Sequence, residues 1–169
     1  MTLDDIDAFV FDFDGVLTDN LVYLDQNGVE CVSCSRADGL AFDVLRKLNK
    51  PAFILSTEKN HVVTMRAKKL KIPAIQGVSD KVEAIKELAD KKNYNLKSIL
   101  YVGNDFNDYL VMQICGSTAC PIDSHPRIKE VSNYILNSKG GKGVIRELLE
   151  EKLKLDFINI LYLNKRTKK

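Results

Sequence analysis

The chain alternates short apolar runs with longer segments in which apolar residues recur every three or four positions. The short runs predict β-strands, and the periodic segments predict amphipathic helices. The predicted strands are residues 8–13, 52–55, 74–76, 98–102, 117–119 and 134–136. The predicted helices are residues 38–49, 61–70, 81–92, 106–114 and 143–153. This order predicts an α/β fold: a Rossmann-like, doubly wound parallel sheet in three layers, with helices on both faces.

Local signals define several boundaries within this pattern. Asp38 and Asp80 are predicted to cap the helices that begin near them, because a short acidic side chain can accept from free backbone N–H groups. Pro51 ends the first of these helices. The run Asp-Gln-Asn-Gly at residues 25–28 is typical of a tight turn, so it predicts a short β-hairpin over residues 21–33.

Composition sets the class of protein. The chain has 169 residues, of which 28% are charged and 45% hydrophobic, so residues 1–169 are expected to form a single domain that ends in a partly apolar tail, residues 155–169. A net charge of +2 gives no reason to expect nucleic acid as a partner, and the basic residues 165–169 are expected to be a frayed terminus. No run is apolar enough to predict a membrane span or a leader, so a cytoplasmic location is expected.

The four cysteines leave two interpretations open. Cys31 and Cys34 have the spacing of a metal-binding pair, and Cys115 with Cys120 could complete a zinc tetrad. Reduced, partly buried thiols are the favoured interpretation for a cytoplasmic protein.

The strongest chemical signal lies where the first predicted strand ends. Asp12 and Asp14 interrupt an apolar run, and Gly15 follows them. Burying an ionised carboxylate is costly unless it is paired or bound to a metal. Because open α/β sheets bind ligands at the carboxyl ends of their strands, two acids there indicate a divalent cation and a nucleophile. The competing interpretation is an acidic turn after an edge strand.

Three further polar segments follow the predicted strands in the same way. They are residues 56–59, Lys81 at a helix start, and residues 103–108. Taken singly, each has an ordinary explanation, since Ser56 could cap a helix, Lys81 could be solvated, and Asn104 could belong to a turn. Taken in order with the acid pair, they indicate one site at one edge of the sheet.

The set and order of these segments resemble the haloacid-dehalogenase superfamily of phosphatases, whose first motif reads Asp-x-Asp-Gly. The resemblance implies that Asp12 attacks phosphorus and becomes an aspartyl phosphate, while Asp14 carries the proton. It also implies that Ser56 and Thr57 hold phosphoryl oxygens and that Lys81 offsets negative charge.

The same resemblance implies a Mg2+ cofactor and a sugar phosphate as substrate. Mg2+ prefers oxygen ligands and keeps several waters, so a few protein oxygens are enough to bind it. The implied metal ligands are Asp12, Asp14, Asn104, Asp105 and Asp108. The implied substrate contacts are Thr18, Thr57, Glu58, Arg66, Lys69 and Arg146.

The spacing of the motifs narrows the resemblance. Residues 14–56 hold only a hairpin and one helix, and residues 56–81 hold one helix and a short strand, so no cap domain fits. This layout, together with Gly-Gly-x-Gly-x-x-Arg-Glu at residues 140–147, looks like the capless branch that dephosphorylates 3-deoxy-octulosonate 8-phosphate or nine-carbon ulosonate 9-phosphates. Members of this branch are usually homotetramers whose hairpins assemble together, which implies self-association of this chain.

Two details favour a nine-carbon substrate within this resemblance, a 2-keto-3-deoxy-nonulosonate 9-phosphate. Glu58 and Lys59 stand where the eight-carbon enzymes typically have Gly-Arg, and Ala37 stands where they usually have Arg. Glu58 and Lys69 match a pair that helps to select the nine-carbon sugar. The eight-carbon ester is the alternative substrate, and a plain surface role is an equal alternative for Lys69.

One departure from the family pattern concerns the metal. Asn104 stands where the family usually has its metal-binding Asp, so the site has one negative charge less. A similar Gly-Asn pair occurs in the non-catalytic, phosphatase-like assembly domain of animal cytidylyl-sialate synthetases. Because Asp12 and Asp14 are both present, an active enzyme is favoured over such a domain. A phospho-accepting receiver domain is disfavoured, because the second core strand ends in Ser56 and not in Asp.

Overall fold

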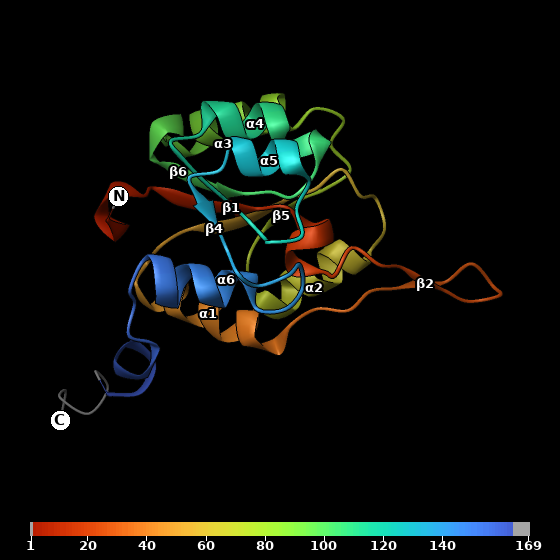
Figure 1. Cartoon of the computed structure of the whole chain (residues 1–169), viewed down its shortest axis with the longest axis horizontal. Helices are drawn as coiled ribbons and strands as arrows, with labels where there is room; N and C mark the ends of the chain where they lie inside the picture. The colour runs from red at the N-terminus through yellow and green to blue at the C-terminus, as the bar shows by residue number, and fades with distance from the viewer. Residues whose placement is uncertain (1, 164–169) are drawn as a thin grey trace.

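The computed structural model describes residues 2–163. Six parallel strands form one sheet, with β1 in its interior (Figure 1). In spatial order the strands are β5 (Ala74–Ile75), β4 (Ala52–Leu55), β1 (Ala8–Phe11), β6 (Ile99–Val102), β7 (Ser117–Cys120) and β8 (Tyr134–Ile135). The chain winds from β1 to β4 on one side and later to β6 on the other, so the predicted doubly wound parallel sheet is confirmed.

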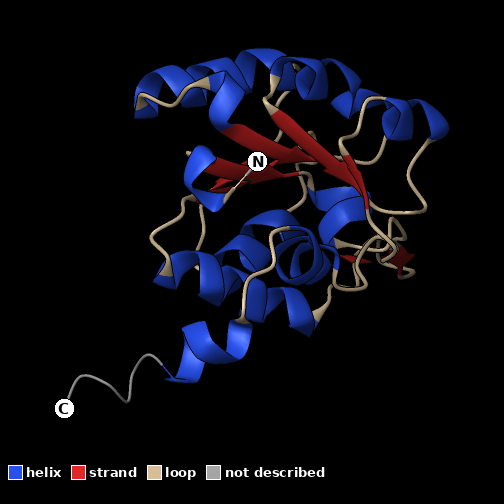
Figure 2. Cartoon of the chain, turned by 60° about the vertical axis from the view of Figure 1, so that its left-hand side comes forward, coloured by secondary structure: helices blue, strands red, loops and turns tan. Residues whose placement is uncertain are grey.

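Helices cover both faces of the sheet (Figure 2). One layer contains α1 (Arg36–Lys47), α2 (Val62–Leu70) and α6 (Val144–Glu147); the other contains α3 (Lys81–Lys92), α4 (Tyr109–Ile114) and α5 (Pro126–Glu130). Alternate residues of β1 pack against the two helical layers, because successive side chains in a strand point to opposite faces of the sheet. Phe9 and Phe11 pack with the first layer, and Ala8 and Val10 pack with the second.

The two predicted caps have different outcomes. Asp80 caps α3 as predicted, accepting from the N–H groups of Val82 and Glu83. The prediction for Asp38 is wrong, because α1 begins earlier and is capped by Ser35, whose hydroxyl accepts from the N–H of Ala37.

Asp38 is instead buried within α1 and caps a different helix. Its Oδ1 accepts from the N–H groups of Ile145 and Arg146, at 2.9 and 3.1 Å, in the first turn of α6. Burial raises the pKa of the Asp38 carboxyl to about 6, although these two donors oppose the shift. The carboxylate therefore satisfies free donors of a helix that lies more than a hundred residues further along the chain.

Several predicted helices are shorter than expected. The segment 106–114 divides into a 3-10 turn, Phe106–Asp108, and α4. The segment 143–153 divides into α6 and a π-helical turn, Leu148–Lys152. The short helix α5 was not predicted, although Pro126 at its first turn and the His125 cap before it were available as signals.

The hairpin and the tail leave the body of the molecule in different ways. The predicted hairpin is present: β2 (Tyr23–Leu24) pairs with β3 (Glu30–Cys31). It projects away from the sheet (Figure 1). The tail turns back as a helical turn, Asn159–Leu163, whose Leu161 is buried with Phe157 against the first helical layer. The predicted basic terminus, residues 165–169, lies outside the described residues.

The cysteines do not form the tetrad. All four lie within the described residues and are free: Cys31 is exposed, Cys34 is half-buried, and Cys115 and Cys120 are buried. Across residues 2–163, no cluster of three or more His, Cys, Asp or Glu side chains could hold a metal ion, so the zinc interpretation has no support. Within the same range, no helix has the length and apolar character that crossing a membrane requires.

The connections determine what stands above the sheet. Between β1 and β4 the chain forms only a π-helical turn (Phe13–Leu17), the hairpin and α1, and between β4 and α3 only α2 and β5. No cap domain is present in the described part of the chain. The carboxyl ends of β1, β4 and β6 therefore open directly at one edge, where a doubly wound sheet binds its ligands.

Candidate active site

The first acid pair lies in a tight turn that follows β1. Asp12 is buried, and its Oδ1 accepts from the N–H of Phe13 at 2.7 Å. Gly15 has φ +79°, and a Cβ there would lie 2.0 Å from the Asn104 side chain, so only glycine fits. The turn leaves Asp12 at the floor of the site and Asp14 half-buried beside it.

A second glycine-rich segment supports this turn from below. Gly141 donates its N–H to the Val16 carbonyl at 3.0 Å. A Cβ at Gly140 would lie 2.3 Å from the Gly15 carbonyl oxygen, and backbone cannot yield as a flexible side chain does. The Gly-Gly-x-Gly signature at residues 140–143 therefore allows two backbone segments to touch directly behind the acid pair.

A buried lysine joins two carboxylates from different elements. Lys81 Nζ, at the start of α3, lies 2.9 Å from Asp12 Oδ1 and 2.7 Å from Asp108 Oδ1. Burial lowers the pKa of Lys81, but the two carboxylates raise it by more, so the lysine stays charged. Burial and the nearby Asp108 raise the pKa of Asp12, and Lys81 offsets only part of that effect. Further positive charge near Asp12 would stabilise its ionised form.

Asp108 does not have the geometry predicted for a metal ligand. Its side chain is fully buried and does not line the cavity described below. Oδ1 accepts from Lys81 and from the hydroxyl of Tyr101, and Oδ2 accepts from the backbone N–H groups of Asn104 and Asp105. All its contacts are therefore with protein donors, and direct metal binding by Asp108 is corrected to a role in holding Lys81 and the loop after β6.

Asn104 completes a group of oxygens that fits a cation. One atom of its side-chain amide lies 2.8 Å from the Asp14 carbonyl oxygen and 3.2 Å from Asp12 Oδ2. When that atom is the nitrogen, it donates to both oxygens. When it is the oxygen, three oxygens face one another without a proton between them, which a cation would stabilise. Adjacent ligands of octahedral Mg2+ lie about 2.9 Å apart, so this donor set fits Mg2+.

The surroundings of Asp14 favour the protonated form of its carboxyl group. Burial raises the pKa of its carboxyl, and the charge of Glu58 raises it further. The Thr18 hydroxyl opposes this shift from 3.5 Å, and it also accepts from the N–H of Gly15 at 3.2 Å. Thr18 is fully buried, so its predicted substrate contact is replaced by support of the Asp14 turn.

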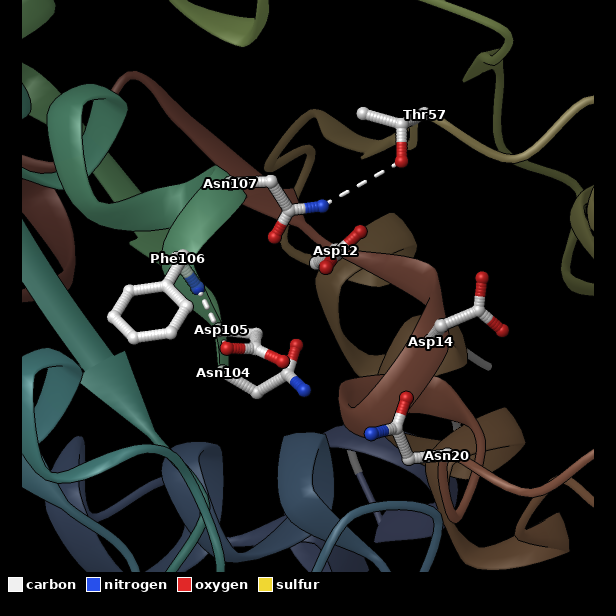
Figure 3. Close-up of a pocket in the computed structure, with 8 residues that line it drawn as sticks. All are labelled: Asp12, Asp14, Asn20, Thr57, Asn104, Asp105, Phe106 and Asn107. Carbon is white, nitrogen blue, oxygen red and sulfur yellow. Dashed lines mark hydrogen bonds between the residues drawn. The ribbon is translucent and has the colours of Figure 1, made fainter.

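These groups open into a cavity of about 290 Å3 at the carboxyl edge of the sheet (Figure 3). The cavity is lined by Asp12, Asp14, Asn20, Thr57, Asn104, Asp105, Phe106 and Asn107. Asn107 Nδ2 lies 3.5 Å from the Thr57 hydroxyl, so the loops after β6 and β4 meet across the mouth. Ser56 is buried at the end of β4, and its hydroxyl accepts from the N–H of Glu58.

Three lining residues were not predicted. Asn20, Phe106 and Asn107 have no charge and match no motif position that carries chemistry. Phe106 and Asn107 do lie between Asp105 and Asp108 in the predicted polar segment 103–108, which was an available signal. Asn20 has φ +62°, a left-handed conformation that its sequence position did not reveal.

Three predicted substrate contacts lie away from this cavity. Arg66 donates to the Ser35 carbonyl at 2.6 Å. Lys69 lines a separate basic groove between α1 and α2. Arg146 pairs with Glu150 at 2.8 Å and stacks over Phe157. Within one copy of the chain, none of these three cations is brought to the acid pair.

Comparisons with known proteins agree with this architecture. A family model described as haloacid dehalogenase-like hydrolase matches residues 37–148. The 3-deoxy-D-manno-octulosonate 8-phosphate phosphatase of Salmonella typhi is 30% identical over 148 residues, which cover 87% of this chain and 79% of that protein. The enzyme of the same name from Yersinia pestis is 30% identical over 146 residues, covering 86% and 78% of the two chains.

Solved structures agree with the sequence relatives. A HAD family hydrolase from Streptomyces avermitilis superposes with a TM-score of 0.87 at 40% identity, covering 89% of this chain and 86% of that one. The 3-deoxy-D-manno-octulosonate 8-phosphate phosphatase of Moraxella catarrhalis, solved with a magnesium ion, a phosphate ion and a KDO molecule, has a TM-score of 0.87 at 28% identity and covers 96% and 94%. The chain therefore belongs to the haloacid dehalogenase-like hydrolases, in the group that contains these phosphatases.

Proposed function

We propose that this chain is a Mg2+-dependent phosphatase that hydrolyses a sugar-phosphate monoester through an aspartyl phosphate on Asp12. The observation that carries the proposal is the buried contact of Lys81 with Asp12, directly below a cavity that Asp14 also lines. A buried, lysine-paired carboxylate at the end of a central strand is costly to maintain for structure alone. Its position fits a nucleophile that works under charge neutralisation.

The reaction has two steps. In the first, the Asp12 carboxylate attacks phosphorus, the ester P–O bond breaks, and protonated Asp14 gives its proton to the leaving oxygen. In the second, Asp14 takes a proton from water, which attacks phosphorus and releases Asp12 and inorganic phosphate. A raised pKa suits Asp14 to this double role, because it must be protonated first and a base afterwards.

The remaining groups hold the phosphoryl oxygens and the cation. Thr57 and Asn107 line the cavity together with Asp12, and the buried Ser56 directly precedes Thr57, so these three are the proposed phosphoryl contacts. Asp12, the Asp14 carbonyl and Asn104 would hold Mg2+, with Asp105 close enough to act through water. When bound, Mg2+ offsets the negative charge on the phosphoryl group.

The proposed substrate is a nine-carbon ulosonate 9-phosphate. Glu58 supports this choice, since it follows the cavity-lining Thr57, its charge reaches Asp14, and, among the described residues, its Oε1 alone is bonded, to the backbone N–H groups of Lys59 and Asn60. A carboxylate acceptor at the rim suits a neutral polyol chain, which offers hydroxyl donors. The eight-carbon ester is the second candidate, because the matched relatives are named as phosphatases of 3-deoxy-D-manno-octulosonate 8-phosphate.

Phosphate release from the purified chain with Mg2+ tests both the phosphatase activity and the choice of sugar phosphate. The substrates are ulosonate phosphates of eight and nine carbons, with a generic phosphate ester as reference. Faster turnover of the nine-carbon ester supports the specific assignment, and faster turnover of the eight-carbon ester overturns it while keeping the phosphatase. Absence of any turnover would favour the non-catalytic assembly domain, the alternative suggested by Asn104.

We further propose that the chain works as a homotetramer assembled through its hairpins. The hairpin exposes Leu21, Val22, Tyr23, Leu24 and Val29, an apolar surface that water does not favour. A neighbouring copy would also bring cations such as Lys69 toward an open site. Sedimentation of Leu24→Asp tests this, with Leu110→Asp as the control for an equally exposed leucine elsewhere. A tetramer that survives Leu24→Asp would contradict the proposed assembly.

A further inference from the structure

Tyr101 is a buried polar residue that the proposed reaction does not use. It lies in β6 with its side chain in the core of the second helical layer, and it is fully buried. Its hydroxyl donates to Asp108 Oδ1 at 2.7 Å. It does not line the cavity, so any effect on the reaction must pass through Asp108.

Asp108 connects the two sides of the site. Oδ1 is shared by the Tyr101 hydroxyl and Lys81 Nζ, both at 2.7 Å. Oδ2 accepts from the backbone N–H of Asn104, at 2.8 Å, and so holds the loop that carries the amide facing Asp12. One carboxylate therefore orients the lysine and also the loop after β6.

Lys81 is divided between two carboxylates. Nζ lies 2.7 Å from Asp108 and 2.9 Å from Asp12, so the ammonium group contacts both. A carboxylate oxygen that already accepts a strong hydrogen bond attracts a second donor less. The Tyr101 hydroxyl thus weakens the attraction between Asp108 and Lys81, and it fixes the plane of the Asp108 carboxylate.

We propose that Tyr101 is a positioning residue for the nucleophile. By donating to Asp108, its hydroxyl keeps Lys81 in contact with Asp12. Loss of the hydroxyl would leave Asp108 Oδ1 with Lys81 as its only donor, drawing the ammonium group away from Asp12. This inference rests on the proposed phosphatase function, since it concerns how Asp12 is held for attack on phosphorus.

Tyr101→Phe is the test, because it removes one oxygen and keeps the ring. The expected result is a fall in kcat on the order of tenfold with KM unchanged, as for a group that acts only on the reacting geometry. Tyr94→Phe is the matched control: Tyr94 packs its ring against Phe53, makes no hydrogen bond through its hydroxyl among the described residues, and should leave kcat unchanged. Thermal unfolding of both variants checks that the fold is intact.

A double-mutant cycle separates positioning from simple destabilisation. If Tyr101 acts through Asp108, then Tyr101→Phe has no further effect on kcat in an Asp108→Asn background. Binding of beryllium fluoride to the Mg2+-loaded protein, followed by fluorine NMR, adds a readout without turnover and should weaken in Tyr101→Phe. A wild-type chain that hydrolyses no ester would overturn the proposed function. An active wild type with an unchanged kcat in Tyr101→Phe, or with equal loss in both backgrounds, would overturn the role of Tyr101.

Discussion

The inner half of the active site and its outer rim are built differently. The inner half consists of Asp12, Lys81, Tyr101 and Asp108, which are buried and joined by contacts of 2.7 to 2.9 Å. The outer rim consists of Thr57, Glu58, Phe106 and Asn107, which are exposed or half-exposed and share one contact of 3.5 Å across the mouth. One copy of the chain therefore fixes the groups that are proposed to act on phosphorus. The groups that would meet the rest of the substrate stay open to solvent.

The largest expected effect comes from the nucleophile. Asp12→Asn should lower turnover by roughly four orders of magnitude, because an amide cannot form the aspartyl phosphate. The free energy of unfolding should not fall, since the change removes a buried charge that lies close to Asp108. Phosphate release and thermal unfolding measure the two quantities, with the surface change Asp90→Asn as control. Substantial remaining turnover would mean that Asp12 is not the nucleophile.

Lys81 should contribute strongly to stability. Lys81→Met leaves two buried carboxylates without their partner, which should lower the free energy of unfolding by about 3 kcal/mol. Lys81 opposes the raised pKa of Asp12, so that pKa should rise further in the variant. A carboxyl whose pKa is raised by folding destabilises the folded state once it must ionise, so the loss should grow as pH rises and shrink as pH falls. Denaturant unfolding at several pH values measures it.

The control for this experiment lies on the same helix. Lys86→Met removes an exposed lysine of α3, and the free energy of unfolding should change by less than about 0.5 kcal/mol. If both variants lose the same free energy of unfolding, the ion pairs of Lys81 do not stabilise the fold. The inner half would then not differ from the rim in this respect.

A rim substitution should change substrate choice and pH dependence, and leave stability nearly unchanged. Glu58→Gln should lower kcat/KM for the nine-carbon ester on the order of tenfold, since the amide is a weaker acceptor for a polyol. Glu58 raises the pKa of Asp14, so removing its charge should lower that pKa and move the basic limb of the pH–kcat profile to lower pH. Steady-state kinetics on both esters measure the effect, and the exposed Glu83→Gln on α3 is the control. If the basic limb does not move, the charge of Glu58 has no influence on the protonation of Asp14.

The smallest expected effect lies at the boundary between the two regions. Asn104→Asp adds one negative charge to the three facing oxygens, so Mg2+ should bind several-fold more tightly. The rise in unfolding temperature with added Mg2+ measures this without turnover. Asn107→Asp adds the same charge to the rim of the same cavity and should tighten binding less. Equal tightening in the two variants would mean that Asn104 has no direct contact with the ion.

The polar residues that follow the strands could be predicted from the sequence. Asp12 and Ser56 come directly after β1 and β4, Asn104 comes two residues after β6, and the carboxyl ends of parallel strands share one edge. Among the assignments that failed, two depended on which partner a side chain reaches. Asp108 contacts Lys81 and Tyr101 and does not line the cavity. Asp38 caps α6, which lies far along the chain. No local pattern encodes either pairing.

The sequence by itself determined the order of strands and helices, the absence of room for a cap, and the acid pair, since each depends on local spacing. Only the tertiary structure decided how Lys81 is shared between two carboxylates, that Tyr101 donates to one of them, Asp108, and that Asn104 faces Asp12. The tertiary structure also places Lys69 and Arg146 away from the acid pair. The physical reason is that charges and donors act over a few ångströms in space, and the packing of distant segments alone determines which groups come that close.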